Sequence, residues 1–327
     1  MTHNTRLFAR LACLLAVALS PTAQAQTPYP SRPIQIIVPF PAGGGSDVVA
    51  RLIAAHVATR LGQPIVVENI AGASSMIGAS KVARAAPDGY TLLMATNTTL
   101  STNPSLQPKM PYDAARDFVP ISQVIRTPLV LITNPNFEAK DVAALVAAAK
   151  REPGKLAYAS FGNGTTGHIG GELFKRATGT DMVHIPYKGS APAIQDLISG
   201  QVPILFDTAA TALAAVKSGR ARGLAVMQPT RSGLAPDIPS IGELGFSGVD
   251  ITVWFGLLAP TGTPDAIVQR LSDEVQSAVK DPEVARRLVA VNVEPVGSTS
   301  AAFGAFLKLD REQMARVIRE ARIRADE

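Results

Sequence analysis

The sequence of 327 residues has one cysteine, one tryptophan and four histidines, and only 5 % of its residues are aromatic. The cysteine, Cys13, lies in the N-terminal leader described below, so the rest of the chain has no disulfide and no thiol chemistry. No two histidines have the spacing of metal ligands, which argues against a metal site, and no motif predicts a cofactor. Basic residues are dispersed or alternate with acidic ones, and the aromatics are few, which argues against a nucleic-acid partner.

The first 25 residues have the pattern of a secretory signal. Arg6 and Arg10 precede an apolar run from Leu11 to Leu19, and Ala23-Gln-Ala25 supplies the small residues of a cleavage site. The run is about half of the roughly 20 apolar residues that a membrane-spanning helix needs. We therefore predict cleavage after Ala25 and export to the periplasm. Without this leader the chain has 29 basic and 26 acidic side chains, a small positive excess.

The rest of the chain contains two similar units. Each consists of an apolar strand, a glycine-rich loop, a helix that ends at a glycine, and a second short strand. The strands of the first unit lie at 34–38 and 65–67, and those of the second lie at 156–160 and 182–185. Three glycines of the first unit have a counterpart 117 residues later, which pairs Gly45 with Gly162, Gly62 with Gly179, and Gly72 with Gly189. Two like units predict two lobes that face each other across a cleft.

Continuous apolar strands that alternate with helices predict an α/β fold with parallel strands. The late strand at 251–259 is followed only by helices, so it needs strands of the first lobe as partners. We therefore predict lobe 1 at 26–125 plus 246–327 and lobe 2 at 126–245, joined by two crossovers that act as a hinge. The segment 103–120 is rich in Pro, Asn and Asp, and is predicted to be a long surface connection.

The first glycine loop is a candidate anion site because a helix begins directly after it. The first N–H groups of such a helix have no partner within the helix and favour an anion. The loop matches neither the dinucleotide-binding pattern nor the phosphate loop of nucleotide-binding proteins. Ser46 and Asp47 can equally serve as helix N-caps. The candidate residues here are Phe40, Ala42, Gly43, Gly44, Ser46 and Asp47.

The second glycine loop, at 160–168, is the corresponding candidate in the other unit. Its glycines free backbone amides, and its hydroxyls, that of Thr166 among them, add neutral donors. The small polar residues can also be helix caps alone, and His168 is more readily explained by packing or hydrogen bonding than by catalysis. The candidate residues here are Ser160, Phe161, Asn163, Gly164, Thr165 and His168.

Polar residues also stand at the ends of two equivalent strands. Thr96 and Asn97 end one strand and Asp207 ends the other, at the edge where open α/β sheets bind ligands. Asp207 suits a ligand ammonium or hydroxyl, or caps the next helix. In the loop after the strand at 182–185, Lys188 beside Tyr187 either neutralises an anion or lies in solvent. Because Thr96 and Asp207 differ, we expect this difference to contribute to selectivity.

The motifs of hydrolytic enzymes are missing from the sequence. No Gly-x-Ser-x-Gly nucleophile elbow occurs, and although Ser160, His168 and Asp207 can be drawn as a triad, nothing in the sequence fixes their geometry. We therefore predict that the protein is not an enzyme. A secreted α/β hydrolase is the alternative.

Several motifs in order resemble one known family. The segments are Pro39–Asp47, Val67–Ala73, Pro87–Leu92, 160–168 and Ile185–Gly189. They are similar to those of the tripartite tricarboxylate transporter solute receptors, the Bug or TctC-like periplasmic binding proteins, over essentially all of the mature chain. The resemblance implies a two-lobed Venus-flytrap receptor, like the type II periplasmic binding proteins, that hands a carboxylated solute to a membrane permease.

The resemblance also implies how the ligand is held. In that family loop amides, hydroxyls and waters hold the carboxylate in place of an arginine clamp, and Ser75 in the loop at 72–77 is a further candidate contact. The ligand can be a di- or tricarboxylate, an aromatic acid or an amino acid. We expect a monomer that works with permease subunits, and the alternative partner is a membrane sensor kinase to which the same fold presents its ligand.

Overall fold

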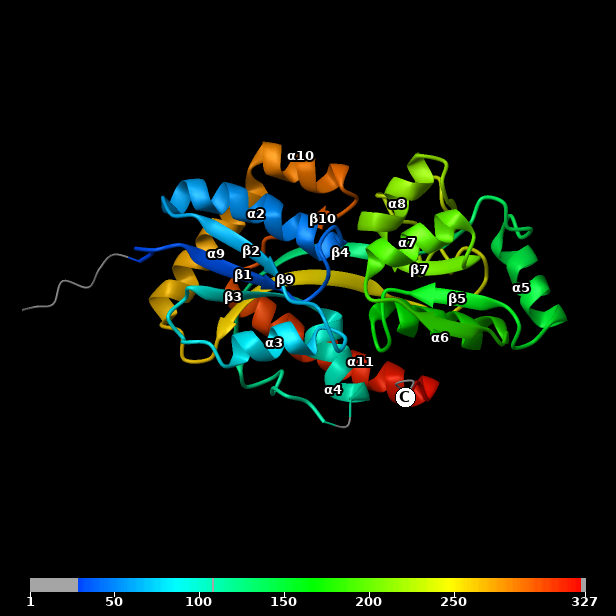
Figure 1. The fold of residues 1–327 in the computed structure, drawn as a ribbon, viewed down its shortest axis with the longest axis horizontal. Helices are drawn as coiled ribbons and strands as arrows, with labels where there is room; N and C mark the ends of the chain where they lie inside the picture. The colour runs from blue at the N-terminus through cyan, green and yellow to red at the C-terminus, as the bar shows by residue number, and fades with distance from the viewer. Residues whose placement is uncertain (1–28, 108, 325–327) are drawn as a thin grey trace, which may run out of the picture. The chain divides into compact units, whose positions relative to one another are not determined.

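The computed structural model describes residues 29–107 and 109–324, so the leader and its predicted cleavage after Ala25 lie outside the described residues. Strands and helices alternate along the described chain, as the α/β prediction requires (Figure 1). The strands are β1 (Ile34–Val38), β2 (Ile65–Asn69), β3 (Thr91–Thr96), β4 (Phe118–Thr133), β5 (Ala157–Ser160), β6 (Val183–Pro186), β7 (Ile204–Thr208), β8 (Arg222–Val226), β9 (Thr252–Pro260) and β10 (Glu294–Pro295). The helices are α2 (Gly45–Leu61), α3 (Met76–Ala83), α4 (Asn103–Leu106), α5 (Val142–Arg151), α6 (Thr166–Thr178), α7 (Ser190–Ser199), α8 (Ala209–Lys217), α9 (Asp265–Lys280), α10 (Pro282–Ala290) and α11 (Ser300–Ala321), with a π-helical turn η1 (Thr98–Thr102).

The first group of strands has the order β2-β1-β3-β9-β4. β1 is parallel to β2 and β3, whereas β9 is antiparallel to both β3 and β4. Figure 1 shows α2, α9 and α10 on one side of these strands and α3 and α11 on the other. Apolar side chains such as Leu93, Trp254 and Phe303 fill the space between the strands and the second helix layer. The late strand β9 thus has the early partners that the sequence analysis required.

The second group of strands has the order β4-β7-β5-β6, with β8 on the other edge of β4. β5 is parallel to β6 and β7, whereas β7 and β8 are antiparallel to β4. A separate apolar cluster that includes Val130, Leu197 and Leu213 packs α7 and α8 against this group. Each group of strands therefore has an apolar cluster of its own.

The strand β4 belongs to both groups. It runs for 16 residues, pairs with β9 from Phe118 to Pro128, and pairs with β7 and β8 from Leu129 onward. The exchange of partners therefore lies slightly beyond the predicted lobe boundary after residue 125. In Figure 1, β4 and β9 are the two strands that run from the first group toward the second.

The prediction of an irregular connection over 103–120 was wrong at both ends, because α4 begins at Asn103 and β4 begins at Phe118. Prolines normally disfavour the interior of a strand and are tolerated at bulges. Pro120 lies where the pairing of β4 with β9 shifts register, and Pro128 is the last residue of that pairing. Because of these two prolines the sequence analysis did not recognise the start of β4. The strand tolerates them because they lie at a shift of register and at the end of the pairing with β9.

No helix of the described segments, 29–107 and 109–324, is long and apolar enough to cross a membrane.

The helix α6 packs closely on its strands because three of its residues are glycines. A Cβ atom added at Gly167 would lie 2.7 Å from the carbonyl oxygen of Phe206, and one at Gly170 would lie 2.2 Å from Leu129 Cδ2. One at Gly171 would lie 2.2 Å from Tyr158 Cε2. These contacts fix the distance between α6 and the sheet, and with it the position of the loop that precedes the helix.

Replacing Gly171 with alanine tests this packing. Alanine favours a helix by up to about 1 kcal/mol over glycine, but forcing a methyl group into a filled core costs about 1–3 kcal/mol. We expect Gly171→Ala to lower the melting temperature measured by circular dichroism. Gly233→Ala is the matched control, since no atom lies within 4 Å of its added Cβ, and it should melt like the parent protein. Equal melting temperatures for both variants would show that α6 does not depend on this contact.

Candidate functional site

Four helices of the described chain begin around one narrow cavity of about 30 Å³. The cavity is lined by the first residues of α2, α6 and α7, which are Gly45, Thr166 and Ser190, and by Thr208, the residue before α8. The helix α2 belongs to the first group of strands, and the other three helices belong to the second. The sequence analysis predicted the starts of α2 and α6 at one site, and the structure adds those of α7 and α8.

The starts of these helices are not capped by side chains. The N-cap residues of α2, α6, α7 and α8 are Gly44, Thr165, Gly189 and Thr208, and none accepts a capping hydrogen bond through its side chain. By contrast, α5, α10 and α11 begin elsewhere and are capped by Asp141, Asp281 and Thr299, although α3 and α9 also lack such a cap. The first amides of an uncapped helix are available to a ligand, and the helix dipole favours an anion there.

Two hydroxyl groups in the wall of the cavity lack a hydrogen-bond partner among the described residues. They are Thr96 Oγ1 and Thr166 Oγ1, and both are buried. A buried polar group without a partner costs free energy, which a ligand with acceptor oxygens can recover. Together with the helix starts, they make the cavity a set of neutral donors. No lysine or arginine from the described chain lines it.

Aromatic rings form the apolar part of the wall. Phe40 and Phe161, from equivalent loops, line the cavity as the sequence analysis predicted, and Phe255 of β9 adds a third ring. Among the other predicted residues, Gly44, Ser46 and Thr96 also line it. The cavity therefore combines an apolar surround with donors at the helix starts.

Other predicted residues of the first loop lie outside the cavity wall. Ala42 and Gly43 are exposed, whereas Asp47 is buried and accepts a hydrogen bond of 3.0 Å from the backbone N–H of Gly43. Asp47 also forms an ion pair of 2.9 Å with Arg51. Burial raises the pKa of the Asp47 carboxyl, but the hydrogen bonds from Arg51 and Gly43 outweigh burial and hold its pKa below the ordinary value. Asp47 thus organises the loop.

In the second loop, Ser160, Thr165 and His168 hold the backbone in place behind the cavity. Thr165 Oγ1 donates to the carbonyl of Gly162 at 2.7 Å, and His168 Nδ1 accepts from the N–H of Gly164 at 3.2 Å. Ser160 Oγ donates to the same Gly162 carbonyl at 3.0 Å. These bonds shape the turn that presents Thr166.

The histidine beside Ser160 is His184, not His168. Ser160 Oγ lies 2.7 Å from His184 Nε2, and the ring of His184 stacks on that of His168 at 4.1 Å between centroids. Ser160 is fully buried, and Asp207 bonds to other residues. The triad of Ser160, His168 and Asp207 considered from the sequence is therefore not assembled.

The remaining loop candidates lie where loops of the two groups of strands touch. Ser74 Oγ donates to the carbonyl of Asn163, and Asn103 Nδ2 donates to the carbonyl of Ser74 at 2.7 Å. Ser75 is buried within 3.5 Å of the same Asn103 nitrogen, and Gly164 faces Leu106. These residues join the loops to each other and do not line the cavity.

Tyr187, Lys188 and Asn97 do not line the cavity. The hydroxyl of Tyr187 donates to Asp196 at 2.8 Å, and Lys188 is exposed. Asn97 donates to the carbonyl of Thr252 at 2.8 Å and lines a different cavity, which is described below.

Asp207 lies one layer behind the cavity wall, where it joins the starts of α7 and α8. Its carboxylate accepts hydrogen bonds from Ser190 Oγ and Thr211 Oγ1, both at 2.6 Å, and from the N–H of Thr208 at 2.8 Å. Burial raises the pKa of Asp207 to about 6, against the opposing effect of these bonds. Since Ser190 and Thr208 line the cavity, Asp207 positions two parts of its wall.

Some lining residues were missed by sequence reasoning. Gly189 and Ser190 carried a visible signal, because a glycine directly before a helix is the pattern used for the first loop. Val253 and Phe255 carried none, since their place depends on the pairing of β9 with distant strands. Among residues 29–107 and 109–324, no three His, Cys, Asp or Glu side chains are grouped to hold a metal ion.

These features are those of a two-lobed α/β protein with a cavity between its lobes. A family model described as tripartite tricarboxylate transporter family receptor matches residues 49–323, and the chain belongs to this family. Protein BugT of Bordetella pertussis is 38 % identical over 319 residues, which cover 97 % of this chain and 98 % of BugT. The resemblance inferred from the motifs is confirmed.

Solved structures agree with this assignment. R. palustris Rpa4515 with adipate is 34 % identical, with a TM-score of 0.88 over 90 % of this chain and 99 % of that chain. MatC from Rhodopseudomonas palustris with bound malate is 31 % identical, with a TM-score of 0.84 over 89 % of this chain and 100 % of that chain. The predicted fold class, a two-lobed periplasmic binding protein, is thereby confirmed, whereas the lobe boundaries stay predictions.

The buried carboxyl of Asp207 predicts a pH dependence of stability. An aspartate in an unfolded chain has a pKa near 3.9, and that of Asp207 in the folded protein is about 6. Between these values the folded state holds a proton that the unfolded state has lost. The contribution of Asp207 to the free energy of unfolding is therefore full below about pH 4 and declines as the pH rises through about 6, by up to about 3 kcal/mol.

Asp207→Asn removes this titration. Urea unfolding at pH 4 and pH 7 should show that the parent protein loses more stability over this interval than Asp207→Asn does. The exposed Asp237 provides a control, and Asp237→Asn should lose as much as the parent. The same pH dependence in all three proteins would mean that folding does not raise the pKa of Asp207.

Proposed function

We propose that this chain is a periplasmic receptor that binds a small carboxylate in the cavity between its lobes and delivers it to the permease of a tripartite tricarboxylate transporter. The single observation that carries the proposal is the convergence of four uncapped helix starts in the described chain on one cavity. Such a site favours a negative charge without a basic side chain. Relatives of similar fold are described with adipate and with malate, which are carboxylates.

Two further observations support the class of ligand. The unpaired hydroxyls of Thr96 and Thr166 can donate to carboxylate oxygens, and the rings of Phe40, Phe161 and Phe255 suit an apolar carbon skeleton. Each lining group is neutral, so the ligand charge is balanced by oriented amides and hydroxyls. This arrangement accepts one carboxylate firmly and leaves the rest of the ligand to shape and hydroxyl contacts.

Ligand entry requires the lobes to separate. The cavity of about 30 Å³ is close to the volume that one water molecule occupies in the liquid, and a dicarboxylate is larger. The strands β4 and β9 join the two lobes, so rotation about them widens the cavity while each core stays intact. Closure on a bound carboxylate then gives the permease a distinct conformation to recognise.

A thermal-shift screen of the protein without its leader tests the proposal. We expect malate or adipate to raise the melting temperature in a saturable way, because a ligand that binds only the folded state stabilises it by mass action. The diamides of the same acids keep the shape without the charge and should have no effect. Stabilisation by the diamides as well, or turnover of a substrate without saturable stabilisation, would contradict a carboxylate receptor.

Threonine-to-valine variants test the site. Thr96→Val and Thr166→Val keep the side-chain shape and remove one donor each. A hydrogen bond to a charged group contributes about 1.5–3 kcal/mol, so each variant should weaken carboxylate binding about 10- to 100-fold in isothermal titration calorimetry. Thr133 is the matched control, since its hydroxyl is also buried and unpaired among the described residues but does not line the cavity. Thr133→Val should bind like the parent. An equal loss of affinity in all three variants would show that the carboxylate does not bind in this cavity.

A further inference from the structure

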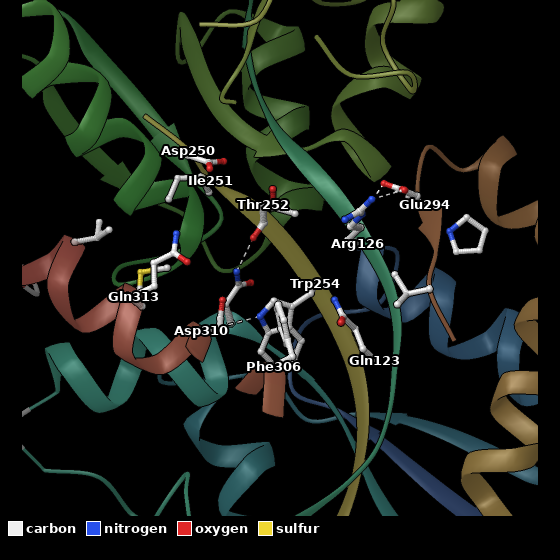
Figure 2. Close-up of a pocket in the computed structure, with 15 residues that line it drawn as sticks. Gln123, Arg126, Asp250, Ile251, Thr252, Trp254, Glu294, Phe306, Asp310 and Gln313 are labelled. Atoms are coloured by element: carbon white, nitrogen blue, oxygen red, sulfur yellow. Dashed lines mark hydrogen bonds and ion pairs between the residues drawn. The ribbon is translucent and has the colours of Figure 1, made fainter. Parts of the chain in front are cut away.

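A second cavity, of about 570 Å³, lies on the other face of β9 (Figure 2). Successive side chains of a strand point to opposite faces of a sheet. Val253 and Phe255 accordingly line the cavity between the lobes, whereas Thr252 and Trp254 line the second one. The volume lies within the range of small-molecule sites.

The second cavity is lined by a carboxamide, that of Gln123, which makes no hydrogen bond to a described residue. Gln123 of β4 is only 8 % exposed and lines the cavity. Within the described chain, its side-chain amide bonds to no other residue, since its contacts with Ser298 are made by the backbone. Figure 2 shows the amide end of Gln123 directed toward the region of Trp254. Such a group, with both donors and an acceptor, is suited to a ligand.

Carboxylates outnumber basic groups around this cavity. Asp250, Glu294 and Asp310 line it together with one guanidinium, that of Arg126. Arg126 is paired with Glu294, to which its guanidinium donates two hydrogen bonds of 2.6 and 2.7 Å. The charges of Asp250 and Asp310 therefore have no basic partner among the described lining residues.

The carboxylate of Asp310 is held in a fixed orientation. Its Oδ2 atom accepts hydrogen bonds from Ser101 Oγ and from Trp254 Nε1, the latter at 2.9 Å. Its other oxygen makes no hydrogen bond to a described residue and remains available to a ligand. Burial raises the pKa of Asp310 above its ordinary value, and a cation beside it would lower that pKa again.

The apolar part of the wall is formed by aromatic and aliphatic side chains. The rings of Trp254 and Phe306 meet edge to face with centroids 5.9 Å apart, and Ile251 and Met314 also line the cavity. The ring of Phe306 is partly exposed, and the carboxylate of Asp310 lines the same cavity, although the neighbouring Arg311 also acts on that carboxylate. An aromatic ring near a carboxylate favours a positively charged group with an apolar body.

We propose that this cavity is a second binding site, for a small organic cation that carries an ammonium group on an apolar body. The ammonium donates to Asp310 and to the carbonyl oxygen of Gln123, and Asp250 contributes its charge at the edge of the cavity. The apolar body packs against Phe306, beside the buried ring of Trp254. This site is independent of the carboxylate site, although β9 forms a wall of both.

Trp254 makes the site directly observable, because it is the only tryptophan of the sequence. The probe is phenethylamine, which is an ammonium ion at neutral pH, added to the protein without its leader and without any carboxylate ligand. We expect a saturable change in tryptophan emission, confirmed by isothermal titration calorimetry. The uncharged isostere 2-phenylethanol should give no saturable change. Because no carboxylate is present, the outcome does not depend on the proposed receptor function.

Three variants and one control locate the probe. Asp310→Asn and Gln123→Met should each weaken phenethylamine binding by about tenfold or more, as expected for lost contacts to a charged group. Asp250→Asn removes an exposed charge that makes no direct contact and should weaken binding by less. Asp237→Asn makes the same charge change at an exposed position outside the cavity and should bind like the parent. Should Asp310→Asn fail to fold, Gln123→Met still decides the test. Absence of saturable binding to the parent, equal binding of the alcohol, or equal affinity in all variants would overturn the proposal.

Discussion

The pairing of β4 with β9 is the constraint on which the rest of the structure depends. The two strands pair from Phe118 opposite Pro260 to Pro128 opposite Thr252, and β4 then continues into the second group of strands. This pair joins an N-terminal sheet to helices that come last in the chain, and it leads into the second lobe. It also sets where the lobes meet, and therefore which helix starts face one another. Successive side chains of β9 point to opposite faces, so one face of the strand lines the cavity between the lobes and the other face lines the second cavity.

The donors of the cavity between the lobes depend on which residue stands directly before each helix. Where glycine, or a threonine whose hydroxyl bonds elsewhere, precedes a helix, no side chain caps the first amides, and this holds for α2, α6, α7 and α8. The acidic residues near the cavity do not line it and instead lie behind its wall. Asp47 orders the first loop, and Asp207 ties together the starts of α7 and α8. The wall of the cavity is thus neutral, and the carboxylates of Asp47 and Asp207 lie behind it and hold the loop and helix starts that form it.

The local part of this arrangement could be predicted from the sequence, and the distant part could not. Glycines before apolar-periodic segments predicted the helix starts at Gly45 and Thr166, and the apolar runs predicted most strands. The helix α3 was missed because Ser75, its N-cap, has a left-handed backbone and gives no side-chain cap. The sequence left open whether Asp207 contacts a ligand or caps the next helix, and the structure directs its oxygens to Ser190, Thr211 and the N–H of Thr208. Which side of a short loop faces the cavity depends on packing between the lobes, and this packing cannot be predicted from local sequence patterns.

The central claim is that neutral donors at helix starts, not a basic side chain, hold a carboxylate between the lobes. A crystal structure of the protein with malate or adipate bound tests it most directly. The account predicts carboxylate oxygens within hydrogen-bond distance of first-turn amides of α2, α6 or α7 and of the hydroxyls of Thr96 or Thr166. A carboxylate held by a lysine or arginine side chain, or bound in the cavity beside Trp254, would contradict it.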